Sequence, residues 1–494
     1  MILLGAYPNT FPGDRAGNSI SDLNKALTAL APADTPLHLL PFTLSSGDGG
    51  FAQDDWFTVS PDLGTWDDIR RMAMSRPLMV DVIYNHVGLK HQYAKRLFSG
   101  LAAAENYLYT YKDTGKDIYP DSPRGGSVLK EYSVDGATFK IWQTFSEEAF
   151  DINLDSPAVE SEIDRHIELL RSVGIWGARM DAPAYYGKTT GSEHRHNENS
   201  LRLARRIADK LVRSGMKITA QLDTDKDGTR YFKKSQGYDI PTIDFSYATN
   251  LIYSVIREDA TVLADHVKKT LSLPTQPLRA PRNHDGILLR TPFLSEANKE
   301  DLLSFAQENE ISPLVHNGVA YELNCSLPYL LGVGMGPLEM QRRVSLTMAI
   351  TIAVPGWCYL YMPYVLGYQP EVHFNREEND PRALNRKQIP LSHLEAYLNS
   401  AIKNERFGLI EYGQSFKKTI DACNLEEDYE IDVCDRSVLR IHLKSHNRWF
   451  YANHSSRTPA RLAIESNARI AFNGGLSGAT LNPLGYVFIE LPDR

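Results

Sequence analysis

The sequence of 494 residues has only four cysteines, no Cys-x-x-Cys pair and no basic residue among its first ten. Four scattered cysteines do not predict a disulfide framework, and without a Cys/His cluster nothing indicates a structural zinc site. The start also lacks the basic region and the small-residue cleavage site of a secretory signal. We therefore expect a reducing, cytoplasmic location.

Long apolar runs and an excess of positive charge are also absent. The longest apolar stretch, about 346–367, is interrupted by Pro355-Gly356, so it predicts a helix and a buried strand rather than a membrane span. The formal net charge of −8 argues against a nucleic-acid-binding groove. With 42% apolar residues, the chain can form one large barrel domain with smaller attached domains.

Short apolar runs alternate with longer amphipathic runs through the first 420 residues. This alternation is typical of parallel strands joined by crossover helices, and 161–172 and 200–214 are two of the predicted helices. Eight predicted strands give the count of an α/β fold of the (β/α)8 TIM barrel type. The eight predicted strands are 2–7, 37–41, 78–84, 176–180, 217–220, 242–245, 278–280 and 357–361.

Two connections, 86–150 and 287–340, are too long for simple loops, so we expect two inserted subdomains. Beyond residue 421, short alternating runs predict a C-terminal antiparallel β domain. The barrel would then be built from 1–85, 151–286 and 341–420, and the β domain from 421–494. Predicted strands of the β domain are 429–433, 438–443, 449–453, 461–464 and 486–491.

Polar motifs follow four of the predicted barrel strands. Catalytic residues of a TIM barrel project from the carboxyl ends of its strands, so these motifs would meet at one face. A retaining glycosidase needs one carboxylate as nucleophile and a second carboxyl group as acid/base. A single Asp after a strand is as often a turn residue, but the combination favours an active site. The motifs are Asp81-Val-Ile-Tyr-Asn85-His86, Arg179-Met-Asp181, Gln221 and Asn283-His284-Asp285.

These motifs resemble those of the α-amylase superfamily, glycoside hydrolase family 13. The motifs that begin at Asp81, Arg179 and Asn283 resemble the first, second and fourth family motifs. Within the superfamily, the chain is most similar to the sucrose phosphorylase group, and the resemblance spans about 37–386. The further matches are Leu39-Leu-Pro-Phe42, Gly49-Gly-Phe51, Gly64-Thr-Trp-Asp67, His284-Asp-Gly-Ile287 and Leu384-Asn-Arg386.

The resemblance implies a role for each matched residue. Asp181 would be the nucleophile that forms a covalent β-glucosyl ester, with Arg179 holding it ionised and aligned. Asp285 would be the transition-state stabiliser. Asp55 and Arg386 would form a pair that closes the far end of the glucose site. The other predicted glucose contacts are His86, Phe145 and His284.

At the end of the fifth strand the family has a Glu as acid/base, whereas this chain has Gln221. An amide cannot exchange a proton, so protonation of the leaving oxygen would fail. Gln221 is either a Glu→Gln substitution that inactivates the enzyme, as is made to trap a substrate complex, or a natural variant with little activity. We favour the first because the other motifs are intact. Asp223 lies on the same predicted strand face, but its reach is shorter.

The acceptor side departs further from the group. Trp56 stands where the group usually has a histidine. Tyr321 and Glu322 occupy a loop that contacts fructose in the group, so both are candidate acceptor contacts, although the pattern here differs. Pro123-Arg124 resembles a pair that approaches phosphate, and a solvated arginine is an equal alternative.

The resemblance implies a phosphorylase that transfers an α-glucosyl group from sucrose or a related α-glucoside to inorganic phosphate, giving α-glucose 1-phosphate. Glucosylglycerate, glucosylglycerol or sucrose 6-phosphate are alternative donors, and α-glucoside hydrolysis and non-catalytic sugar binding are alternative functions. No metal or organic cofactor is expected. The spacing from Asp223 to Gly228 resembles a calcium loop, but Lys234 replaces its bidentate Glu. No nucleic acid or membrane partner is expected, and the chain is expected to be a monomer or a homodimer.

Overall fold

The computed structural model describes the whole chain except residues 13–16, 98, 101–103, 112–126, 135–136, 189–193, 290–293, 312, 317–318, 371–381 and 493–494. Arg124, the predicted phosphate contact, lies outside the described residues.

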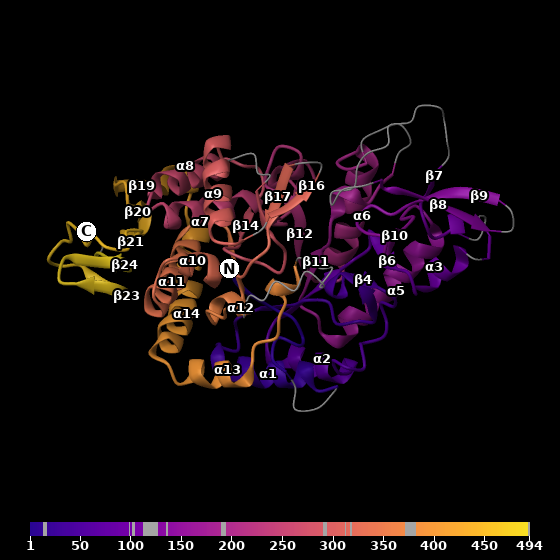
Figure 1. The fold of residues 1–494 in the computed structure, drawn as a ribbon, viewed down its shortest axis with the longest axis horizontal. Coiled ribbons are helices and arrows are strands. Elements are labelled where there is room, and N and C mark those ends of the chain that lie inside the picture. Colours follow the sequence, from indigo (N-terminus) through magenta and orange to yellow (C-terminus); the bar gives the residue numbers. More distant parts are fainter. Residues whose placement is uncertain are drawn as a thin grey trace.

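A closed barrel of eight parallel strands forms the centre of the molecule (Figure 1). Each strand pairs with its predecessor and successor along the chain, and the last pairs with the first. The structure confirms the predicted TIM barrel, although most strands are shorter than predicted. The strands are β1 (Ile2–Ala6), β2 (Leu37–Leu39), β5 (Leu78–Val82), β11 (Gly177–Met180), β12 (Lys217–Asp223), β13 (Thr242–Ile243), β14 (Pro277–Arg279) and β18 (Trp357–Tyr361).

Helices cover the outside of the barrel, and their ends follow from local sequence. The helix α5 begins with Pro157, which needs no amide donor there, and ends at Gly174 in the left-handed conformation with φ 91°. Thr65 and Asp68 form a capping box at the start of α2. The helices around the barrel are α1 (Ser19–Leu30), α2 (Trp66–Ser75), α5 (Pro157–Val173), α6 (Glu198–Arg213), α7 (Phe245–Ile256), α8 (Ala260–Leu271), α10 (Leu327–Gly332), α11 (Pro337–Ala353), α12 (Met362–Val365), α13 (Leu391–Leu398) and α14 (Ala401–Ala422).

Two inserted segments follow the carboxyl ends of β5 and β14, so both start from the same end of the barrel. The first segment contains β6 (His86–Gly88), α3 (Gln92–Leu97), β7 (Thr110–Tyr111), β8 (Leu129–Val134), β9 (Ala137–Trp142) and β10 (Ala149–Asp151). The second contains β15 (Ile287–Leu288), α9 (Glu296–Glu308), β16 (Pro313–His316) and β17 (Val319–Leu323). We retain 86–150 and 287–340 as the proposed bounds of the two subdomains.

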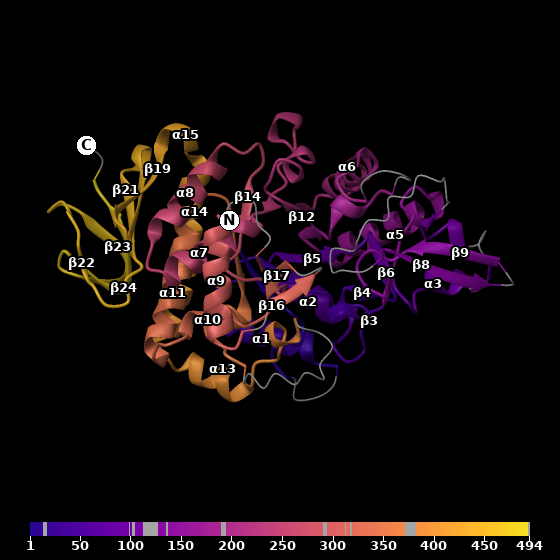
Figure 2. The ribbon, with the colours of Figure 1, turned by 45° about the horizontal axis from the view of Figure 1, so that its top comes forward.

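A predominantly antiparallel sheet forms the C-terminal domain, as predicted, and Figure 2 shows it at the opposite end of the molecule from the first inserted segment. The predicted strand 461–464 is wrong in extent, because only Ala460–Arg461 pairs with the sheet. The strand β23 was not predicted, since Asn473, Gly474 and Gly475 interrupt its sequence pattern. After α15 (Leu425–Asp428), the strands are β19 (Tyr429–Asp435), β20 (Val438–Leu443), β21 (Arg448–Asn453), β22 (Ala460–Arg461), β23 (Arg469–Ser477) and β24 (Thr480–Glu490).

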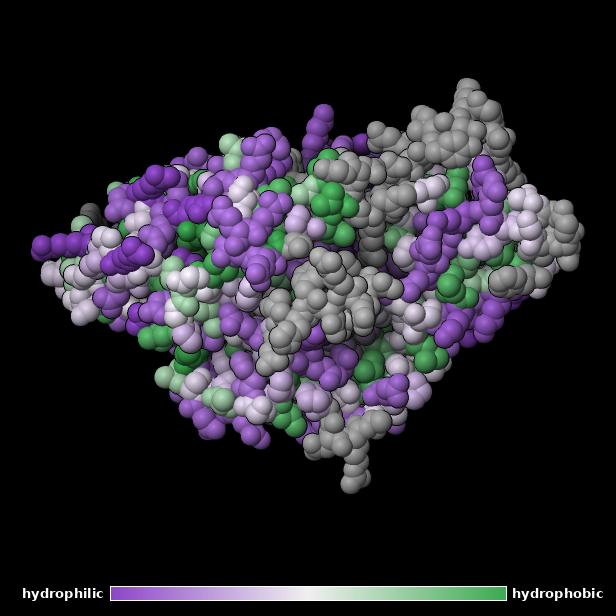
Figure 3. Space-filling model, in the orientation of Figure 1, coloured by the Kyte–Doolittle hydropathy of each residue, from purple (hydrophilic) through white to green (hydrophobic). Residues whose placement is uncertain are grey.

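The face of the molecule drawn in Figure 3 is largely hydrophilic, with hydrophobic residues in small groups. None of the helices in the described part of the chain is long and apolar enough to cross a membrane. The predicted apolar stretch at 346–367 instead forms the buried end of α11, the strand β18 and the short helix α12.

Candidate active site

The central carboxylate of the site is Asp181, directly after β11. Its position follows from strand register, because Arg179 on β11 lies opposite Asp81 on β5 and Thr219 on β12. Arg179 Nη1 lies 3.2 Å from Asp181 Oδ1 and also contacts Asp81. Asn85 Nδ2 donates to the other oxygen of Asp181 at 3.3 Å. Asp181 is therefore held by one guanidinium and one amide, as the predicted nucleophile requires.

The two neighbouring carboxylates carry opposite pKa shifts. Burial raises the pKa of Asp181 to about 6; Arg179 opposes the rise, whereas the charges of Asp81 and Asp285 add to it. Burial also acts to raise the pKa of Asp81, but His38 and Arg179 outweigh it and lower this pKa to about 2. Asp81 therefore stays ionised and paired with Arg179. Of these two carboxylates, Asp181 is the one whose pKa lies closer to neutrality.

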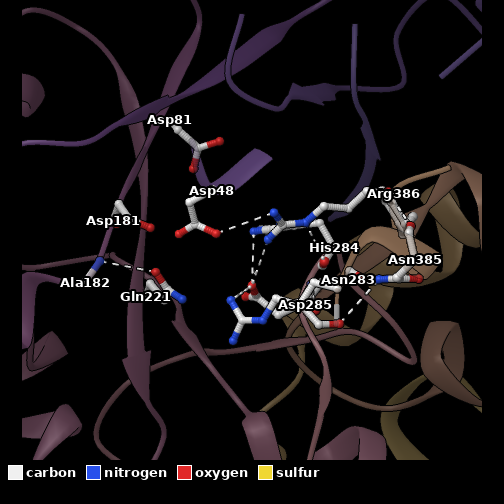
Figure 4. Close-up of polar contacts among 12 residues, drawn as sticks. Asp48, Asp81, Asp181, Ala182, Gln221, Asn283, His284, Asp285, Asn385 and Arg386 are labelled. Carbon is white, nitrogen blue, oxygen red and sulfur yellow. Dashed lines mark hydrogen bonds and ion pairs between the residues drawn. The ribbon is translucent and has the colours of Figure 1, made fainter. Parts of the chain in front are cut away.

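Asp285 faces this group from the loop after β14 (Figure 4). Its Oδ1 lies 2.8 Å from Arg382 Nη1, 3.5 Å from His284 Nε2 and 3.8 Å from Arg386 Nη2. Burial acts to raise the pKa of Asp285, but His284 and the guanidinium groups of Arg382 and Arg386 outweigh it and hold this pKa well below its usual value. Burial lowers the pKa of His284 to about 3, so this ring is neutral. Asp285 therefore remains an anion in a buried setting.

The partner of Arg386 is Asp48 rather than the predicted Asp55. Arg386 Nη1 lies 3.5 Å from Asp48 Oδ1, and Figure 4 shows the two side chains facing each other. Asp55 instead accepts hydrogen bonds from Phe57 N and Thr58 Oγ1, at 2.7 Å each, within its own turn. The predicted pair is therefore wrong, and Asp48 takes the place of Asp55.

A left-handed loop makes the Asp48 contact. Asp48 and Gly49 have φ values of 49° and 60°. A Cβ on Gly49 would lie 2.2 Å from Arg386 Nη1, so glycine at this position lets the guanidinium approach the loop. The close approach of Arg386 therefore explains the first glycine of the matched motif Gly49-Gly-Phe51.

Aromatic rings enclose the same region. Phe51 stacks on His284 with ring centroids 4.9 Å apart, and Phe145 lies 4.9 Å from His86. The ring of Tyr185, from the turn after Asp181, lies 5.1 Å from Phe145. Of the predicted contacts, His284 therefore lies against Asp285, whereas His86 and Phe145 lie together beside Tyr185. Flat apolar faces beside carboxylates suit a sugar ring with its hydroxyl groups.

Gln221 sits on β12 at a register shift between Ala220 and Asp223. Its Oε1 accepts a hydrogen bond from Ala182 N at 3.2 Å. Burial raises the pKa of Asp223 to about 8, and the charges of Asp225 and Asp244 add to the rise.

Glu322, a predicted acceptor contact, is instead buried against Arg382. Its side chain is only 2% exposed, and its two oxygens lie 3.0 Å from Arg382 Nε and Nη2. This buried ion pair leaves the carboxylate facing Arg382 instead of an acceptor. Tyr321 lies close to Tyr185 and to Arg382, and burial raises its pKa to about 12, so it stays a neutral candidate contact.

Two residues of the site were missed by sequence reasoning. Asp48 directly precedes the matched Gly49-Gly-Phe51, and Arg382 lies four residues before the matched Arg386. Both residues therefore lie beside motifs that the sequence had already matched. Among the described residues, no group of three or more His, Cys, Asp or Glu side chains is arranged to hold a metal ion.

The chain is similar in sequence to several known proteins. Residues 34–262 match the family model of the alpha amylase catalytic domain. Glucosylglycerol phosphorylase of Marinobacter adhaerens is 24% identical over 436 residues, which cover 84% of this chain and 88% of that protein. Glucosylglycerate phosphorylase of Escherichia coli is 25% identical over 426 residues, which cover 82% of this chain and 75% of that protein.

A solved structure extends the likeness to the fold of nearly the whole chain. Sucrose 6F-phosphate phosphorylase from Thermoanaerobacter thermosaccharolyticum superimposes with a TM-score of 0.78 over 92% of this chain and 93% of that one. The sequence identity is 18%, so this likeness concerns the fold.

Proposed function

We propose that the chain is a retaining α-glucoside phosphorylase of the α-amylase superfamily, glycoside hydrolase family 13, because residues 34–262 match the alpha amylase catalytic domain and phosphorylases are among its relatives. Its donor would be sucrose or a related α-glucoside, and its acceptor inorganic phosphate. The observation that carries this proposal is Asp181, a buried carboxylate held by Arg179 and Asn85 and faced by Asp285.

In the proposed mechanism, Asp181 attacks the anomeric carbon of the donor glucose and forms a β-glucosyl ester. Asp285 stabilises the positive charge that develops on the ring, and Arg386 with Asp48 holds the hydroxyl groups at the closed end. Phosphate then attacks the ester from the opposite face, so the product is α-glucose 1-phosphate with net retention. This chemistry requires no metal or organic cofactor.

The proposal includes a set of candidate leaving alcohols. The matched relatives are named for glucosylglycerol and glucosylglycerate. Glu322 is bound by Arg382, and Tyr321 is the remaining candidate acceptor contact among the described residues. Glucosylglycerol, glucosylglycerate and sucrose 6-phosphate are therefore donors to test beside sucrose.

Gln221 favours a second candidate function, sugar binding without turnover. Its amide cannot donate the proton that a leaving alkoxide needs, so we propose that the present chain is an inactivated Glu→Gln form. A protein that only binds α-glucosides would bind them tightly and form no covalent ester.

Covalent labelling tests the proposed function. α-Glucosyl fluoride needs little acid help, so it should glucosylate Asp181, and the ester should persist because Gln221 cannot activate water as a base. Mass spectrometry of the peptide that contains Asp181 should show one added hexose. Addition of phosphate should then release glucose 1-phosphate. Labelling that survives in Asp181→Ala would reject the nucleophile, and a persistent ester that ignores phosphate would reject phosphorolysis.

The rate of this labelling should depend on pH through Asp181. The nucleophile must be ionised, and its pKa of about 6 means that half of the protein is reactive near pH 6. The rate should therefore be constant above about pH 7 and fall about tenfold for each unit below pH 6. A profile measured with α-glucosyl fluoride from pH 4 to pH 8 checks this. A profile flat down to pH 4 would mean that Asp181 is not the titrating group.

The corrected pair gives a further prediction. Asp48→Ala should weaken glucose binding by about 10- to 100-fold, because a hydrogen bond to a charged group contributes about 1.5–3 kcal/mol. Asp55→Ala is the matched control, and it should leave the affinity nearly unchanged because Asp55 bonds only within its turn. Calorimetric titration with glucose measures both. If Asp55→Ala weakened glucose binding and Asp48→Ala did not, Asp55 rather than Asp48 would be the residue in the site.

A further inference from the structure

A hydrogen-bonded network of buried side chains leads from the last barrel strand to the proposed nucleophile. Tyr359 of β18 contacts His38 of β2, with 3.2 Å between Tyr359 Oη and His38 Nδ1. His38 Nε2 lies 2.9 Å from Asp81 Oδ2, and the other oxygen of Asp81 contacts Arg179 Nη1. Since Arg179 Nη1 also lies 3.2 Å from Asp181 Oδ1, the network ends on the carboxylate that would attack the sugar.

A glycine in β1 makes room for the first of these contacts. The strand β1 lies between β18 and β2, so Tyr359 must cross it to reach His38. A Cβ on Gly5 would lie 1.9 Å from Tyr359 Oη, and glycine avoids this clash. Both rings are buried and line the same cavity as Arg179. Glycine at position 5 is therefore what lets the Tyr359 hydroxyl reach the ring of His38.

The protons of this network have fixed places. Burial acts to raise the pKa of Asp81, but His38 and Arg179 lower it to about 2, so this carboxylate is ionised and can only accept. His38 Nε2 must therefore carry a proton. Burial raises the pKa of Tyr359 well above its usual value, so its hydroxyl stays protonated and can donate to Nδ1 of the neutral imidazole. Tyr359 thus holds His38 in the tautomer that donates to Asp81.

We infer that His38 and Tyr359 are positioning residues, which orient Asp81 and through it hold Arg179 beside the nucleophile. The inference rests on the proposed function, since it takes Asp181 as the nucleophile. His38 and Arg179 bind different oxygens of Asp81, so the carboxylate cannot turn without losing one of them. A displacement of about 1 Å can cost about 10²-fold in rate, so this support affects the reaction without requiring a contact to the sugar.

Labelling of Asp181 by α-glucosyl fluoride tests the inference, with two variants at position 38. His38→Leu removes the donor to Asp81 and should lower the maximal rate of labelling by about 10- to 100-fold. The concentration that gives half of the maximal rate should stay the same, because the proposed glucose contacts Asp48 and Arg386 are unchanged. His38→Gln keeps an N–H donor of similar reach and should retain most of the rate.

The pH dependence separates a positioning role from a general loss of structure. The groups that act on Asp81 are His38, Arg179 and His284. The charge of Asp81 in turn adds to the rise that burial causes in the pKa of Asp181, which is about 6. Without His38, Asp81 should take up a proton at a higher pH, and a neutral Asp81 no longer raises the pKa of Asp181. The fall in labelling rate at low pH should therefore move below pH 6 in His38→Leu and stay near pH 6 in His38→Gln.

Tyr359→Phe is the smallest change to the network, because it removes one hydroxyl group and keeps the ring. His38 then loses the contact that fixes its tautomer, so labelling should slow by about two- to tenfold, the usual effect of one neutral hydrogen bond. Tyr364→Phe is the matched control. It removes another buried hydroxyl, which bonds Thr347 Oγ1 and Val344 O away from this network, and labelling should keep its rate.

The outcomes distinguish the inference from the proposed function. If the unmodified chain is labelled at Asp181, and His38→Leu and Tyr359→Phe match its rate and pH profile, the inference is wrong and the proposed function stands. Equal losses in His38→Gln and His38→Leu would also overturn it, because the N–H donor would then have no effect. If His38→Leu fails to bind glucose in a calorimetric titration, Tyr359→Phe decides. No labelling of the unmodified chain would reject the proposed function, and the inference with it.

Discussion

Replacement of Gln221 by Glu should raise the rate of α-glucoside cleavage by about 10²–10⁴. The substitution supplies a carboxylic acid at the end of β12, where the leaving oxygen of a donor bound to Asp181 would receive a proton. The gain should be largest for poor leaving groups such as sugar and glycerol alkoxides. Product analysis with sucrose, sucrose 6-phosphate, glucosylglycerol and glucosylglycerate, with and without phosphate, measures the gain and the acceptor.

Control reactions define what the gain means. α-Glucosyl fluoride should benefit much less from Gln221→Glu, because fluoride leaves with little protonation. Gln221→Asp provides a matched acid of shorter reach and should restore less activity than Glu. Restored cleavage that yields only glucose in the presence of phosphate would favour the hydrolase. Absence of cleavage for every donor would leave sugar binding as the better account.

Arg382→Ala should destabilise the protein by about 3–5 kcal/mol, because it leaves the buried Glu322 carboxylate without its counter-charge. It should also weaken catalysis, since Arg382 Nη1 lies 2.8 Å from Asp285. Chemical unfolding followed by a probe in the barrel measures the first effect, and labelling of Asp181 measures the second. The double variant Arg382→Leu with Glu322→Leu is the control, because it removes both charges. If the single and double variants lose equal stability, the unpaired charge is not the cause.

The motif residues could be predicted because their positions depend on single strands and on the register between adjacent strands. Arg179 and Asp181 share one strand, and the register of adjacent parallel strands brings Asp81 beside them. The eight barrel strands were found for the same reason, since each is a short apolar run flanked by polar residues. Periodicity and strand ends carry this information in the sequence alone.

The contacts that were missed depend on geometry between distant segments. Asp48 and Asp55 lie in the same loop region, and sequence cannot show which of them turns toward Arg386. The left-handed backbone at Asp48 and Gly49 is what turns Asp48 toward Arg386. The acceptor role predicted for Glu322 was wrong because Arg382, sixty residues later, binds both oxygens.

The two proposed glucose contacts Asp48 and Arg386 come from opposite sides of the place where the barrel closes. Asp48 and Arg386 are separated by 338 positions in the chain, and the strands β1 and β18 that meet between their segments form the seam of the ring. A glucose that bridges the two side chains would fasten the early and late parts of the chain to each other across that seam. A growing chain would therefore gain its sugar affinity only after Arg386 has been synthesised. Bound glucose should then slow hydrogen exchange at the Cys358 amide, which bonds to the carbonyl of Met1.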